Sequence, residues 1–180
     1  MAEDKKLFAF TQWVLRAGIV VTTLLIGMYV LGVAAMTLAL ATSHLPLDRI
    51  ASWTGVTMTA DEIGRMALAA FVGAIAALTL VQLILRALRR VVASARAGDP
   101  FIEANATHLV RVAWLLLGVE VIAALIKPVV YLLAPAAVRA KVHDVVHISV
   151  TGLFAVLLIF VLAQIFRRGS DMRAELAGTI

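Results

Sequence analysis

The chain has 180 residues, of which 63% are hydrophobic and 15% are charged, and its formal net charge is +5. A typical soluble domain is much less apolar, so this composition argues against one and indicates a membrane protein. The absence of cysteine excludes disulfides, iron–sulfur clusters and cysteine-based zinc sites. Basic residues in membrane proteins usually mark cytoplasmic flanks that meet anionic lipid, so the charge does not indicate direct nucleic-acid binding.

Four apolar stretches are long enough to cross a hydrocarbon layer about 30 Å thick. They cover residues 13–41, 66–88, 109–133 and 147–166. The first stretch is much longer than the apolar region of a signal peptide, so we predict that it is a retained helix. The sequence therefore predicts one all-α integral membrane domain over residues 1–180, a bundle of four transmembrane helices. Its middle connection is residues 89–108 and its tail is residues 167–180.

The basic residues predict the orientation of this bundle. Eleven lie at the two ends and around the middle connection: Lys5, Lys6, Arg16, Arg86, Arg89, Arg90, Arg96, Arg111, Arg167, Arg168 and Arg173. The other two connections carry four: Arg49, Arg65, Arg139 and Lys141. Because cytoplasmic loops are enriched in Lys and Arg, both termini and the middle connection are predicted to be cytoplasmic. Four spans also require both ends to share a side.

Local patterns predict where two of the helices begin. Thr59 and Glu62 have the spacing of a capping box, which would start the second helix ahead of its apolar stretch. Asn105 precedes the third stretch, and we expect it to act as the N-cap of that helix.

The middle connection has the pattern of a basic amphipathic helix. Its arginines fall within about 120° of a helical wheel, opposite a run of apolar residues; they are Arg86, Arg89, Arg90 and Arg96. One interpretation is an anchor that lies on the lipid surface. The other is a docking surface for an acidic or helical partner. The sequence alone does not separate them.

Two ionisable residues, Glu120 and Lys127, lie within the third stretch. A charge inside a membrane is costly, and it usually faces the bundle interior or a polar cavity. Their separation along the helix makes a direct salt bridge unfavourable. Glu120 would either serve a proton-coupled pathway or fix helix packing, and we prefer the packing interpretation.

The pair His143 and His147 would place two imidazoles on one helical face, as in zinc-binding helices. Asp144 stands where such enzymes carry a glutamate base, and no third ligand is evident nearby. We therefore interpret the pair as the polar start of a helix and keep it as a weak metal candidate. We predict no catalytic site and no cofactor. Small residues in the first two spans, such as Gly32 and Gly73, predict close helix packing, with self-association as the weaker alternative.

Two cytoplasmic segments carry a family resemblance. The first contains Gly98, Pro100 and Phe101, followed by Asn105 and Arg111, and the second is the tail from residue 163 to residue 180. Together they resemble the small four-helix bacterial membrane proteins grouped as domain of unknown function 2975. The resemblance implies a location in the bacterial cytoplasmic membrane. It also implies a frequent gene neighbour, a helix-turn-helix regulator of the Cro/C1 type. The family has no established activity.

From this resemblance we hypothesise a non-enzymatic protein that holds or releases such a regulator at the cytoplasmic face. The expected partner-binding residues are Arg86, Arg89, Arg90, Arg96, Pro100, Phe101, Asn105, Arg111, Phe166, Arg167, Arg168, Gly169, Glu175 and Thr179. The rival hypothesis is a small transporter or channel component that uses Glu120 as an intramembrane proton or cation site. The scarcity of polar residues in the spans and the lack of paired broken helices argue against it.

Overall fold

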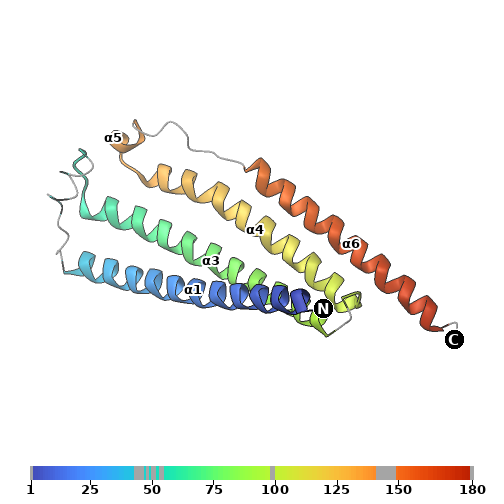
Figure 1. Cartoon of the computed structure of the whole chain (residues 1–180). Coiled ribbons are helices and arrows are strands. Elements are labelled where there is room, and N and C mark those ends of the chain that lie inside the picture. The colour runs from blue at the N-terminus through green and yellow to red at the C-terminus, as the bar shows by residue number, and fades with distance from the viewer. Residues whose placement is uncertain are drawn as a thin grey trace. The chain divides into compact units, whose positions relative to one another are not determined.

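The computed structural model describes residues 2–42, 47, 49, 52, 55–97, 100–140 and 149–178, and every regular element in these ranges is helical. Four helices are long and one is a single short turn (Figure 1). Their bounds are α1 (Ala2–Ala41), α3 (Ala60–Arg96), α4 (Glu103–Leu133), α5 (Ala136–Arg139) and α6 (Val150–Gly178).

The four long helices are both long and apolar enough to cross a membrane. Their lengths of 29 to 40 residues correspond to about 43 to 60 Å at the rise of an α-helix. Large apolar side chains on them are open to the surroundings, such as Leu31 (70% exposed), Leu132 (71%) and Val150 (79%). Faces of this kind are unfavourable in water and suited to lipid. The prediction of an all-helical chain with four membrane-capable helices is therefore confirmed.

The helix ends show how the sequence starts and extends these elements. The capping box of α3 is confirmed, because the Glu62 N–H donates to Thr59 Oγ1 (3.2 Å) and the Thr59 N–H donates to Glu62 Oε2 (2.8 Å). The Gly152 N–H donates to Ser149 Oγ (2.9 Å), so Ser149 caps α6. The predicted start of the fourth span at His147 lies outside the described residues. Helix α3 continues to Arg96 and α6 to Gly178, so much of the predicted connection and tail is helical.

Contacts divide the chain into two compact units. Unit 1 comprises Met1–Thr23, Thr79–Glu120 and Ser149–Ile180, and unit 2 comprises Leu24–Leu78 and Val121–Ile148. Unit 1 thus contains both ends of the chain and the connection between α3 and α4. The single membrane domain predicted from the sequence remains a prediction.

In unit 1, α3 contacts both α1 and α4, and α4 contacts α6. Gln82 Nε2 on α3 donates to Thr23 Oγ1 on α1 (2.6 Å). The Trp114 ring on α4 meets the Phe160 ring on α6 edge to face, with 5.5 Å between ring centroids. Three small side chains on α4 and α6 are almost fully buried: Ala106, Ala113 and Ala163. Small residues at helix contacts allow backbones to come close where lipid supplies no hydrophobic driving force.

In unit 2, glycines also lie under larger side chains. A Cβ at Gly32 would lie 3.2 Å from Phe71 Cε2, and a Cβ at Gly73 would overlap the Ile126 side chain. Phe71 also contacts the Tyr29 ring, with 5.8 Å between centroids. These contacts support the packing interpretation of the small residues in the first two spans. Self-association through them stays a prediction.

The absence of native cysteine allows a direct test of the predicted orientation. Ala137→Cys and Asp171→Cys would each carry one thiol at an exposed position. With both termini cytoplasmic, a membrane-impermeant maleimide added to intact cells should label Ala137→Cys and leave Asp171→Cys unlabelled until the cells are opened. Labelling of Asp171→Cys in intact cells would contradict the charge-based topology.

Candidate functional site

The connection between α3 and α4 is held by a buried amide. Asn105 is 1% exposed, and its Nδ2 donates to Ser94 Oγ (2.6 Å) and to the Pro100 carbonyl (2.8 Å). Both bonds run from the first turn of α4 to the end of α3 and the connecting segment. The predicted role of Asn105 as an N-cap is wrong, because α4 begins at Glu103 and the Asn105 side chain donates outward rather than accepting an N–H of its own helix.

Phe101 follows this connection and packs against α6. Its ring lies 5.2 Å from the Phe166 ring between centroids, and the planes are tilted by 41°. A Cβ at Gly169 would lie 2.7 Å from Phe101 Cδ1, so the aromatic ring lies directly over the glycine backbone. The absence of a side chain at Gly169 permits this approach. The structure therefore brings the two family-like segments, far apart in the sequence, into direct contact.

Beside this aromatic contact lies a hollow of about 390 Å³, which we call the aromatic hollow. It is lined by Phe101, Ile102, Glu103, Ser170, Asp171, Arg173 and Ala174. Its lining combines an apolar surface with two carboxylates and one guanidinium, so it suits a polar protein segment better than a purely apolar ligand. Sequence reasoning named Phe101 among the binding residues but missed Glu103 and Asp171. The helical spacing of Ser170, Asp171 and Ala174 was the signal that could have placed them on one face.

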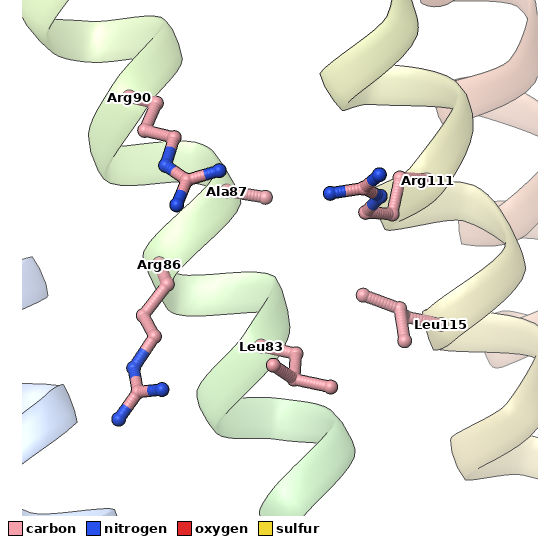
Figure 2. A pocket seen from close by; sticks show the side chains of 6 residues that line it. All are labelled: Leu83, Arg86, Ala87, Arg90, Arg111 and Leu115. Atoms are coloured by element: carbon pink, nitrogen blue, oxygen red, sulfur yellow. The ribbon is translucent and has the colours of Figure 1, made fainter.

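The arginines of the predicted basic helix have different surroundings. Two of them, Arg86 and Arg90, line a second hollow of about 340 Å³ together with Arg111 of α4, and we call this hollow the arginine pocket. Its lining residues are Leu83, Arg86, Ala87, Arg90, Arg111 and Leu115 (Figure 2). Arg96 instead donates from Nη1 to Gln12 Oε1 on α1 (3.1 Å). Arg89 is exposed and lines neither hollow.

Of the remaining predicted binding residues, all but Pro100 lie on or beyond α6. Arg167, Arg168 and Glu175 have exposed side chains on this helix. Thr179 lies outside the described residues, so its proposed role is untested. Pro100 contributes its carbonyl to Asn105 and is half-buried.

Glu120 lies on α4 with its carboxylate against the backbone of Gly152 on α6, where a Cβ would overlap the carboxylate. The Glu120 side chain is half-buried, whereas Lys127 is exposed. Neither side chain forms an ion pair with another described residue. This contact with α6 supports a packing role for Glu120 and leaves a transport role untested.

A metal centre has no set of ligands in the described ranges. Those ranges hold no group of three or more His, Asp or Glu residues arranged to bind an ion. The weak candidates His143 and His147 lie outside the described residues, so that prediction stays open.

These features define the chain as an all-helical protein with four membrane-capable helices and two side-chain-lined hollows in unit 1. The family described as "Protein of unknown function (DUF2975)" matches residues 50–180, and the chain belongs to this family. The match contains both segments that meet at Phe101 and Gly169, whereas α1 lies before it. Comparisons with curated proteins and with solved structures found no match.

The hydrogen bonds of Asn105 predict a specific effect on stability. Asn105→Asp keeps the shape of the side chain but replaces the donating Nδ2 with an oxygen. The Pro100 carbonyl would lose its donor and face a carboxylate oxygen, which should lower the free energy of unfolding by about 1–3 kcal/mol. Thr107→Ala is the matched control, since Thr107 is exposed on the same turn and bonds only its own helix. Thermal unfolding in detergent measures both, and equal losses would contradict the role of Asn105.

Proposed function

We propose that this chain is a non-enzymatic membrane protein of the bacterial cytoplasmic membrane, inserted with both termini in the cytoplasm. It would bind a helix-turn-helix transcriptional regulator through the aromatic hollow and the exposed face of α6 beside it. Binding at the membrane would keep the regulator from its DNA sites. Release would follow a change in the bundle.

The observation that carries this proposal is the meeting of Phe101 with Phe166 and Gly169. Residues from the two segments that carry the family resemblance line one hollow, and packing of the helices alone does not require its carboxylates and guanidinium. Aromatic side chains within a polar rim are typical of the centres of protein interfaces. The resemblance to this family implies a Cro/C1-type helix-turn-helix regulator as a frequent gene neighbour, and this regulator is the partner that we propose.

The location of the aromatic hollow agrees with this partner. Unit 1 contains both chain ends and the connection between α3 and α4, and the charge distribution predicts that these segments are cytoplasmic. A DNA-binding regulator is available on that side of the membrane alone. The hollow carries two carboxylates, Glu103 and Asp171, against one guanidinium, so it would favour a basic segment of the regulator.

Reversing one charge in the aromatic hollow tests this proposal. The tagged chain is co-expressed with the regulator encoded beside it and captured in mild detergent. Asp171→Lys places a positive charge in the hollow at an exposed position. We expect the affinity for the regulator to fall at least about tenfold, which corresponds to about 1.4 kcal/mol.

The control for this experiment is Asp61→Lys, at another exposed aspartate, near the start of α3 in unit 2. Its pair with Arg65 is on the surface and contributes little to stability. Asp61→Lys should leave capture within about twofold of the unmodified chain. Failure of the unmodified chain to capture the regulator would refute the proposed function, and equal loss in both variants would refute the aromatic hollow as the binding site.

The transporter alternative is supported by one observation, the half-buried carboxylate of Glu120 at the contact with Gly152. Glu120→Gln removes the ionisable group and keeps the shape of the side chain. Under the regulator proposal, proteoliposomes should show the same proton leak with either chain, and capture of the regulator should be unchanged. A proton or cation flux that Glu120→Gln abolishes would instead support the transporter.

A further inference from the structure

The arginine pocket concentrates positive charge at one end of two membrane-capable helices. Arg86 and Arg90 project from α3, and Arg111 projects from α4. Figure 2 shows the guanidinium groups of Arg90 and Arg111 extending toward one another across the space between the helices. Like charges repel, so this arrangement is unfavourable unless an anion lies near both groups.

None of these three arginines forms an ion pair or a hydrogen bond with another described residue. Arg96, six residues after Arg90 on α3, does donate to Gln12, so not every arginine at this end of α3 lacks a partner among the described residues. Guanidinium groups bind phosphate through two parallel N–H bonds and are preferred for this task over lysine. Two such groups that extend from neighbouring helices form a fork of the right chemistry for one phosphate.

The rest of the lining is apolar and lies on the membrane side of the charges. Leu83 precedes Arg90 by about two helical turns, and Leu115 follows Arg111 by about one. Figure 2 shows these leucines facing the same space. Both positions lie within the predicted spans, so the apolar wall continues toward the hydrocarbon layer while the arginines lie at its edge. An occupant that satisfies the whole lining carries a phosphate at one end and an alkyl chain at the other.

We propose that the arginine pocket is a binding site for an anionic phospholipid. The phosphate lies between Arg90 and Arg111, Arg86 adds to the positive potential, and an acyl chain follows Leu83 and Leu115. Basic pockets between membrane helices on the cytoplasmic side are suited to such headgroups. This site is separate from the aromatic hollow and does not depend on a regulator. The sequence predicted that the basic helix could contact lipid, and this site specifies which arginines bind the lipid phosphate.

The test measures binding of short-chain phosphatidylglycerol to the full-length chain in a nonionic detergent, with short-chain phosphatidylcholine and inorganic phosphate as comparison ligands. The unmodified chain should bind phosphatidylglycerol at least about tenfold more tightly than phosphatidylcholine, a difference of about 1.4 kcal/mol. The double variant Arg90→Gln with Arg111→Gln should lose this preference. Arg89→Gln is the matched control, since Arg89 is an exposed arginine on α3 that does not line the pocket. It should keep the preference.

A second variant distinguishes loss of lipid binding from loss of the folded structure. Arg111→Lys keeps the charge but not the planar fork, so it should bind phosphatidylglycerol with an affinity between those of the unmodified chain and the double variant. Circular dichroism without lipid should be the same for all variants.

Three results would overturn the proposal. The first is equal loss in Arg89→Gln, which would indicate general surface charge. The second is competition by inorganic phosphate as strong as that of the lipid, which would indicate a site for free anions. The third is an unchanged lipid preference in the double variant together with lost capture of the regulator, which would assign the arginines to a protein partner.

Discussion

A hydrocarbon layer offers no hydrogen-bond partner, so a chain that crosses it must pair every backbone N–H and C=O internally. The four long apolar helices of this chain meet that constraint. Polar side chains within the helices follow the same rule. Thr22 donates to the Gly18 carbonyl (2.9 Å) and Thr23 to the Ile19 carbonyl (2.7 Å), while Gln82 reaches Thr23. Apart from Glu120 and Lys127 on α4, the helices therefore present mostly apolar surface along their middle parts.

The polar contacts that could define a site are consequently concentrated near the ends of the helices. At the connection between α3 and α4 the chain leaves its internal hydrogen bonding, and the buried amide of Asn105 supplies part of what is lost. Because Asn105 ties the connection to α3, it also fixes the position of Phe101 in that connection. Phe101 then packs on Phe166 and Gly169. The aromatic contact and the aromatic hollow beside it therefore depend on the buried amide that holds the connection.

Local features of this fold could be predicted from the sequence, and contacts between helices could not. The Thr59–Glu62 box was predictable because both partners lie within one turn. The Ser94 partner of Asn105 and the Phe166 partner of Phe101 lie on other helices, and a helix that is apolar on all sides gives no sequence signal for the face it packs. The helical wheel grouped four arginines because it considers one helix alone. In the structure Arg86 and Arg90 line the arginine pocket, Arg96 contacts Gln12, and Arg89 is exposed. The sequence did not predict that the tail is helical, because its polar residues show no helical repeat of apolar positions.

The aromatic hollow and the arginine pocket both use α4, and the hollow's Glu103 precedes the pocket's Arg111 by about two turns. A partner in one and a lipid in the other would therefore act on the same helix. The aromatic hollow is proposed to face a cytoplasmic regulator, and in-cell photocrosslinking from position 174 measures this directly. A photoreactive residue in place of Ala174, which lines the hollow, should yield a crosslink to the helix-turn-helix regulator, and one in place of Ala137 should not. A crosslink from position 174 only to proteins on the opposite side of the membrane, or equal crosslinking from both positions, would contradict the claim.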